Sequence, residues 1–372
     1  MSLEKILKPE EKATFKLREL YKSYGFLPFE MSRFEEYDLY FKNKDFLVSA
    51  ECITFLDKNG RLLALKPDVT LSIIKNSPED KKIQKLYYDE NVFRINKGET
   101  AFKEILQAGL ECFGDIGSYE IAEVLLLAVK SLEMLGKNFV LDISDMSLIS
   151  AAIKSSKLSS DGEKKYLNLL KQKNSHEFLK LAQEENLNET STKKLLSLIN
   201  LSGSYKKVIE SLKPLLIEEE EKSSLNNLSF YCSLLEKSGY KDCVKLDFSA
   251  LGGMKYYNGV VFKGYIENVN DSVLSGGQYD NLLLKMGRNC KGIGFALYLD
   301  LIKEIEEKAD NYDFDTLLVY DDNVKLEAVF KKMEELSKEG SVRAAKELSK
   351  ENSYRRALKF DGIKTEVLYE NR

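Results

Sequence analysis

Short runs of β-branched and aromatic residues constrain this fold more than any other feature of the sequence. The runs are FLPFEM, CITFLD, RLLALK, KLYYDENVFRI and ILQAGLECFG, all between residues 26 and 114, and Gly, Asn or Asp separates most of them. Runs of this length are typical of strands, and turn residues between them favour hairpins. We therefore expect an antiparallel sheet rather than βαβ repeats, and an α+β fold.

Segments with helical periodicity flank and interrupt these strands. Residues 9–23 carry apolar side chains at helical spacing, and Gly25 follows as a stop signal, so we expect a helix there. Residues 119–135 return to the helical pattern before the strand-like NFVLDIS. From about residue 147 to 237 the chain is rich in Leu, Lys, Glu and Ser with a 3.6-residue period, which predicts an inserted helical subdomain.

An acidic run, IEEEEK at residues 217–222, lies in this helical segment. Such a run could suggest a metal or polycation site. Adjacent positions of a helix point in different directions, however, and cannot converge on one ion. We therefore interpret the run as a solvated helix face.

The last third of the chain changes character twice. Residues 252–294 hold glycine-rich, strand-like segments, and glycine in strands lets a ligand or another backbone come close. Beyond about residue 312, we expect a strand at DTLLVY, a helix over about 323–338, further helical residues after Gly340 and a strand at TEVLY. These patterns predict a main domain of residues 1–311 and a small C-terminal α/β domain of residues 312–372.

Composition narrows the function classes. A formal net charge of −4 offers no general attraction for nucleic acid. No stretch approaches the roughly 18–20 apolar residues of a membrane span, and the N-terminal sequence lacks the apolar core of a signal peptide, so we expect a cytoplasmic protein without membrane contact. The five cysteines are scattered without the spacing of a zinc site or redox dithiol, so we expect reduced thiols and no metal. The single histidine, His176, lies in a polar helical stretch and is interpreted as a surface residue.

Polar residues embedded in apolar, strand-like segments are the strongest chemical signal. They provide carboxylates, an amide, a hydroxyl, phenols and one guanidinium: Asp68, Thr70, Arg94, Gln107, Glu111, Tyr256 and Tyr257. On neighbouring strands, these groups would suit a small zwitterion, with carboxylates and amide for its ammonium and Arg94 for a carboxylate or phosphate. For any single residue, an ordinary outward-facing position on a half-buried strand explains the pattern about as well. Their joint occurrence favours a pocket.

Five ordered segments resemble the class II histidyl-tRNA synthetase catalytic domain and, still more, its paralogue family, the ATP phosphoribosyltransferase regulatory subunits of histidine biosynthesis. They are LKPDVT, LYYDENVFRINKGETAFKEILQAGLECFG, MKYYNGVVFKGY, GGQYDNLL and GIGFALYLD, and the match runs from about residue 7 to 301. The resemblance implies a class II synthetase-like antiparallel sheet flanked by helices. It also implies histidine contacts at Asp68, Thr70, Gln107, Glu111, Tyr256 and Tyr257.

The departures from the synthetase pattern concern arginines. Arg94 is retained, but Gly252 and Leu301 stand where the family has arginines that stabilise the charge developing on the ATP α-phosphate. Loss of one such contact costs a factor of roughly a hundred to a thousand in rate, so we expect no catalytic residues and, at most, trace adenylation. Lys66 and Gln278 also replace arginines.

Two further departures concern the ends of the match. The motif 1 proline is displaced, with Met31 and Ser32 near its expected place and Pro28 earlier. The tail after residue 312 is much shorter than the anticodon-binding domain of a synthetase. Both the lost arginines and the short tail favour the regulatory family.

Membership of that family would imply a regulatory subunit of ATP phosphoribosyltransferase that assembles with a short-form catalytic subunit and also with itself as a dimer. The partner would hold ATP, phosphoribosyl pyrophosphate and magnesium, and this chain would need no cofactor. Histidine would act as effector if it binds two states of the complex with different affinity. A functioning histidyl-tRNA synthetase, a free-standing amino-acid-binding adaptor and a purely structural pocket remain alternatives.

Overall fold

The computed structural model describes residues 7–47, 51–79, 81–95, 101–251, 256–304, 312–348 and 352–371. The chain divides into two compact units, Ala13–Ile305 and a second that combines Glu306–Arg372 with Met1–Lys12. The predicted domain boundary at residue 311 lies outside the described residues and stays a prediction.

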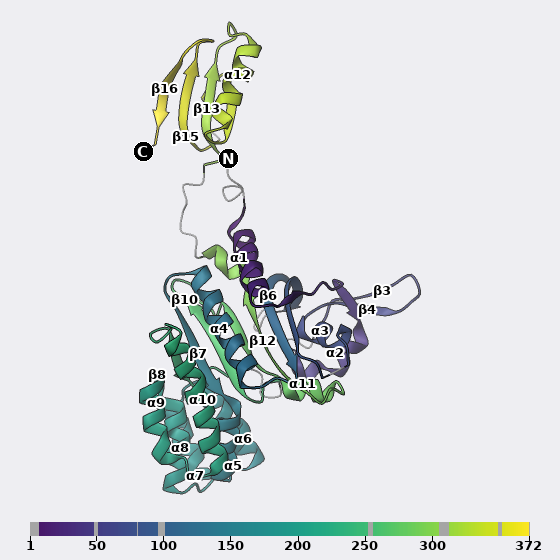
Figure 1. Cartoon of the computed structure of the whole chain (residues 1–372), viewed down its shortest axis with the longest axis vertical. Helices are drawn as coiled ribbons and strands as arrows, with labels where there is room; N and C mark the ends of the chain where they lie inside the picture. Colours follow the sequence, from purple (N-terminus) through teal and green to yellow (C-terminus); the bar gives the residue numbers. More distant parts are fainter. Residues whose placement is uncertain are drawn as a thin grey trace. The chain divides into compact units, whose positions relative to one another are not determined.

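The described residues of the larger unit build a nine-stranded sheet (Figure 1). Its strands, in spatial order, are β1 (Leu27–Pro28), β5 (Gln84–Ile95), β6 (Phe102–Gly114), β12 (Lys291–Tyr298), β11 (Leu274–Gln278), β10 (Val260–Ile266), β7 (Phe139–Asp145), β9 (Val244–Asp247) and β8 (Ser202–Ser204). The neighbours pair antiparallel except for β1 with β5 and β7 with β9. The predicted antiparallel sheet is confirmed. The β7–β9 pair is parallel because the whole helical insertion separates these two strands along the chain.

The two faces of this sheet bury different clusters. On one face, Leu110 and Cys112 of β6 join the main core with α1 (Pro9–Ser23) and α4 (Ser118–Leu135), which crosses the sheet in Figure 1. On the opposite face, Tyr88 and Val92 of β5 pack in a second cluster with α3 (Thr70–Asn76) and α11 (Asp280–Lys285). Because strand side chains alternate between faces, the polar residues of β5 and β6 that share the second face lie beside α3.

A separate three-stranded sheet precedes α3. It pairs β2 (Phe34–Glu36) and β3 (Thr54–Leu56) with β4 (Leu62–Leu65), and α2 (Tyr37–Lys42) follows β2. In Figure 1 the β3–β4 hairpin extends away from the main sheet. The sequence runs at 52–57 and 61–66 therefore do form a hairpin, but outside the main sheet.

The segment predicted as a helical insertion folds into α5 (Met146–Ser156), α6 (Ser160–Lys171), α7 (Ser175–Glu184), α8 (Glu189–Asn200), α9 (Tyr205–Leu212) and α10 (Glu219–Lys237). The prediction of a solvated face at residues 217–222 is wrong at one position, Glu221. Glu221, in the acidic run, has 0% of its surface exposed, and its carboxylate lies 2.6 Å from Nζ of Lys194 on α8. The other five residues of the run, 217–220 and 222, are exposed as predicted. Glu221 differs because it lies on the side of α10 that faces the neighbouring helices.

The C-terminal unit contains β13 (Phe314–Tyr320), α12 (Leu326–Ser337), β14 (Val342–Ala345), β15 (Tyr354–Phe360) and β16 (Thr365–Glu370), with strand order β14–β13–β15–β16. Our expectation of further helical residues after Gly340 is wrong, since Val342–Ala345 is a strand parallel to β13. Arginine and alanine favour helices, but Val342 and Ala344 pack in the cluster under α12. Tertiary packing thus overrides the local preference.

Candidate functional site

Three predicted site residues share one face of the main sheet. Strands β5 and β6 pair in a register that sets Glu90 opposite Gln107 and Leu86 opposite Glu111. Since side chains alternate, Arg94, Gln107 and Glu111 all lie on the face covered by the second cluster. Each is buried, with 6%, 5% and 2% of its surface exposed.

Two further predicted residues, Asp68 and Thr70, approach this face from the start of α3. The Asp68 carboxylate accepts a hydrogen bond from the backbone N–H of Leu71 at 2.9 Å, in the first turn of the helix. The Thr70 hydroxyl donates to Oε1 of Glu111 at 2.7 Å. The N-terminus of α3 is therefore attached directly to β6.

Glycines on two adjacent strands leave space beside Glu111. Gly294 of β12 pairs with Glu111, and Gly277 of β11 pairs with Gly294, so the three form one row across the sheet. A Cβ on Gly294 would lie 1.9 Å from Oε2 of Glu111, and a Cβ on Gly277 would lie 2.8 Å from the ring of Tyr257. The glycines thus admit the carboxylate and the phenol ring against the sheet.

The tyrosine pair lies just before β10 and builds an aromatic wall. The rings of Tyr256 and Tyr257 meet edge to face, with centroids 4.6 Å apart, and the ring of Tyr279 lies 6.1 Å from that of Tyr256. Tyr279 was not among the predicted site residues, although it lies in the GGQYD segment. Its hydroxyl faces Glu111, and only the pairing of β11 with β12 reveals this proximity.

Electrostatic effects link these groups. Burial raises the pKa of Glu111 to about 8, against the opposing effects of the Thr70 and Tyr279 hydroxyls. Burial also raises the pKa of Asp68, while the backbone N–H of Leu71 and the charge of Arg94 oppose the shift. Burial, followed by the charge of Asp68, raises the pKa of Tyr256. Asp68, Arg94, Glu111 and Tyr256 therefore lie near enough for the charge on one to affect the pKa of another.

Three buried polar atoms of this face make no hydrogen bond within the described structure: Nε of Arg94, Oε2 of Glu111 and the hydroxyl of Tyr279. The Tyr279 hydroxyl lies beside Glu111, and the two groups influence each other's pKa. Unpaired buried polar groups cost free energy, so such a set is expected where a ligand supplies the partners. The ligand must offer an acceptor to Arg94 and a donor to Glu111.

The positions where arginines were expected have other roles. Leu301, in the 3-10 segment Leu299–Glu304, packs against the main core, and Gly252 lies outside the described residues. Lys66 is fully buried, with its Nζ 2.5 Å from Oε2 of Glu90. Gln278 accepts a hydrogen bond from the backbone N–H of Val260 at 2.9 Å. Of the expected phosphate contacts, the described structure brings Arg94 to this face.

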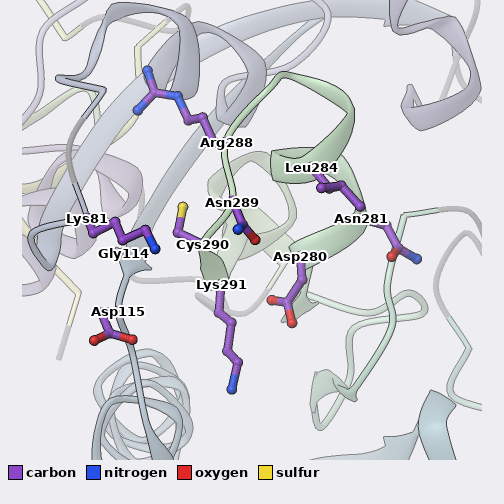
Figure 2. A pocket seen from close by; sticks show the side chains of 10 residues that line it. All are labelled: Lys81, Gly114, Asp115, Asp280, Asn281, Leu284, Arg288, Asn289, Cys290 and Lys291. Carbon is purple, nitrogen blue, oxygen red and sulfur yellow. The ribbon is translucent and has the colours of Figure 1, made fainter.

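A pocket of about 350 Å³ lies elsewhere, at the end of the sheet where β6 stops and β12 begins (Figure 2). Its charged lining residues are Lys81, Asp115, Asp280, Arg288 and Lys291, and Figure 2 shows the Arg288 side chain pointing away from the other four. Arg288 donates to backbone carbonyls at the end of α3 instead. None of the predicted site residues lines this pocket.

Other predictions concern the cysteines, the histidine, metal ligands and membrane spans. All five cysteines are free thiols. His176 is exposed on α7. Among the described residues, no three histidine, cysteine, aspartate or glutamate side chains are grouped as metal ligands would be, and no helix has the length and apolar character to cross a membrane.

Comparison with known proteins identifies the family. The family model for histidyl-tRNA synthetase matches residues 3–302. A protein from Clostridium novyi, named ATP phosphoribosyltransferase regulatory subunit, is 31% identical over 342 residues, which cover 88% of this chain and 80% of that protein. A protein of the same name from Clostridium acetobutylicum is 28% identical and covers 87% and 82% of the two chains.

Solved structures share the fold. An ATP phosphoribosyltransferase regulatory subunit/histidyl-tRNA synthetase from Bacillus halodurans matches with a TM-score of 0.73 at 24% identity, over 90% of this chain and 88% of that one. A chain of the ATP phosphoribosyl transferase (HisG:HisZ) complex from Thermotoga maritima matches with a TM-score of 0.63 at 22% identity, over 78% and 97%. The class II synthetase-like fold implied by the sequence motifs is confirmed. The chain belongs to the histidyl-tRNA synthetase family, and within it to the group named ATP phosphoribosyltransferase regulatory subunits.

Proposed function

We propose that this chain is the non-catalytic regulatory subunit of ATP phosphoribosyltransferase, required by a short-form catalytic subunit in the first step of histidine biosynthesis. The names of its relatives and the fold it shares with a chain of the Thermotoga maritima complex support this proposal. The apolar Leu301, in place of an expected arginine, argues against synthetase chemistry. The catalytic partner would hold ATP, phosphoribosyl pyrophosphate and magnesium, and this chain would bind no cofactor.

Histidine is the proposed effector, bound on the face described above. The observation that carries this proposal is the set of unpaired buried atoms on Arg94, Glu111 and Tyr279. A zwitterionic amino acid has a carboxylate for Arg94 and nitrogen donors for Glu111. Asp68, Thr70 and Gln107 would bind its polar groups, and Tyr256 and Tyr257 would enclose it.

Self-association is a further part of the proposal. In the N-terminal region, the β3–β4 hairpin and β2 expose Phe34, Phe55, Leu56 and Leu62. Phe34 and Phe55 meet edge to face on one side of this sheet, and Leu56 and Leu62 pair on the other. Exposed apolar side chains gathered on one element favour an interface there. We therefore place the interface of a dimer at this hairpin.

A mixing assay tests the regulatory role. The purified chain is combined with a short-form catalytic subunit, and ATP phosphoribosyltransferase activity is measured with and without histidine. We expect a stable complex, activity that requires this chain, and inhibition by histidine that Glu111→Gln reduces. Glu177→Gln, on the exposed surface of α7, is the matched control. Histidine-dependent ATP–pyrophosphate exchange at ordinary synthetase rates by the chain alone would overturn the proposal.

A further inference from the structure

A buried ion pair borders the proposed ligand site. The Lys66 side chain is 0% exposed, and its Nζ lies 2.5 Å from Oε2 of Glu90, whose side chain is 20% exposed. The backbone carbonyl of Lys66 also accepts a hydrogen bond from the N–H of Phe93 at 2.9 Å. The pair thus connects the chain after β4 to β5 through both backbone and side chain.

Strand register sets this pair beside Arg94. Glu90 lies opposite Gln107, and Gln107 lies opposite Tyr298, so the three form one row across β5, β6 and β12. The guanidinium of Arg94 stacks on the Tyr298 ring, 5.5 Å from its centroid. Arg94 therefore reaches back over the row that contains Glu90. Glu111 lies four residues beyond Gln107 on β6, so the Cα atoms of these two residues are about 13 Å apart at the usual rise of a strand.

The charges at this end suit a carboxylate better than a phosphate. Of the two buried cations, Lys66 is already paired with Glu90, and Arg94 keeps an unpaired Nε. One guanidinium can match the single charge of a carboxylate. A phosphate ester carries up to two charges and a triphosphate more, while the Glu90 carboxylate already neutralises Lys66, so Arg94 alone would face the larger charge.

We propose that the Lys66–Glu90 pair is a specificity element that closes the site to phosphate-bearing ligands and leaves it open to a free amino acid. The proposal rests on the proposed function in one respect, that an amino acid occupies this face. It explains how a synthetase-like pocket can sense an amino acid without competition from nucleotides.

Substitution of Glu90 tests the proposal on the full chain. Binding of AMP, ATP and L-histidine is measured by calorimetry and by the shift in melting temperature. The wild type is expected to bind histidine and to show no AMP binding up to millimolar concentrations. Glu90→Gln frees Lys66 beside Arg94, so we expect AMP affinity to rise at least tenfold and AMP to raise the melting temperature.

Three variants control for other effects. Lys66→Gln with Glu90→Gln removes both charges and should gain no AMP binding. Glu35→Gln removes the partner of another lysine, Lys75 on α3, at 2.6 Å, and should behave as wild type. Glu90→Asp withdraws the carboxylate with less disturbance and should give a smaller gain in AMP affinity. It replaces Glu90→Gln if that variant is too unstable to purify.

AMP binding by the wild type equal to that of Glu90→Gln would overturn the inference. No gain in either Glu90 variant would overturn it as well. Failure of the proposed function would give a different result, namely no histidine binding in any variant. The difference in AMP binding between the wild type and Glu90→Gln could still be measured.

Discussion

Residue 294 is a glycine, and the space left by its lack of a side chain holds the Glu111 carboxylate. An added Cβ would lie 1.9 Å from Oε2 of Glu111 and 2.5 Å from the Leu110 carbonyl oxygen, so the carboxylate would have to move. We expect Gly294→Ala to weaken histidine binding about tenfold, since overpacking a buried site typically costs 1–3 kcal/mol. Calorimetric titration measures the affinity for histidine. Gly117→Ala, where the nearest atom is 3.7 Å from the added Cβ, should bind normally. Equal affinity in all three proteins would contradict this geometry.

The buried Glu111 carboxylate also predicts a pH dependence of stability. Its pKa is raised from 4.5 to about 8, so the folded chain holds a proton that the unfolded chain releases above about pH 4.5. Stability must therefore fall as pH rises toward 8. The raised pKa values of Asp142 and Asp145, both about 6, act in the same direction mostly below about pH 6.5. The raised pKa of Asp68 also acts in this direction, so the contribution of Glu111 is obtained from comparison with Glu111→Gln.

Between about pH 6.5 and 8 we expect the free energy of unfolding of the unliganded wild type to fall by about 1–2 kcal/mol, since one pKa unit corresponds to about 1.4 kcal/mol. Glu111→Gln should reduce this decrease. Urea unfolding at several pH values provides the measurement. Parallel pH profiles for the two proteins would show that Glu111 is ionised in the folded chain.

At the scale of residues, the sequence groups the polar side chains but does not show how they meet. Asp68, Glu111 and Tyr256 can be selected because they interrupt apolar segments or belong to recognisable motifs. The roles of Gly294 and Tyr279 depend on the register between strands that are far apart in sequence. The Lys66–Glu90 pair depends on the packing of the chain after β4 against β5, which the sequence does not show either.

At the scale of elements, a buried ion pair holds the helical insertion together. Nζ of Lys194 on α8 lies 2.6 Å from Oε1 of Glu221 on α10, and the Ser155 hydroxyl of α5 donates to the same oxygen at 2.5 Å. Breaking a buried pair leaves one charge uncompensated. We expect Lys194→Met to destabilise the chain by about 3–5 kcal/mol in urea unfolding.

The matched control is the double variant Lys194→Met with Glu221→Leu. It replaces the whole pair by apolar side chains, and we expect it to recover most of the lost stability. A single variant as stable as wild type would show that the pair is dispensable.

The same elements show where local patterns suffice. The α1 helix spans the residues that its periodicity predicts, because its apolar stripe at Leu17, Leu20 and Tyr21 is also its buried face. The strand Val342–Ala345 was missed because its neighbours, not its composition, determine its conformation. Glu221 was misassigned because its partner, Lys194, lies on another helix.

At the scale of the molecule, the proposed assembly depends on the exposed apolar hairpin. Leu56 and Leu62 pair across β3 and β4 and are 67% and 45% exposed. Carboxylates at these positions would remain solvated in a monomer but would lose water and repel one another if two copies met there. We expect Leu56→Glu with Leu62→Glu to convert a dimer to a monomer, as measured by light scattering across a concentration series.

Leu179→Glu distinguishes this interface from a general effect of added charge. Leu179 is 43% exposed on α7, in the helical insertion, so its substitution should leave the oligomeric state unchanged. Neither variant should destabilise the fold of the single chain, because Leu56, Leu62 and Leu179 are all exposed. Melting temperature provides the check. Histidine binding should also persist in the hairpin variant, since the ligand contacts on α3, β5 and β6 come from one chain. A hairpin variant that stays dimeric would locate the contact between copies elsewhere, whereas loss of histidine binding on dissociation would mean that the partner copy helps to form the site.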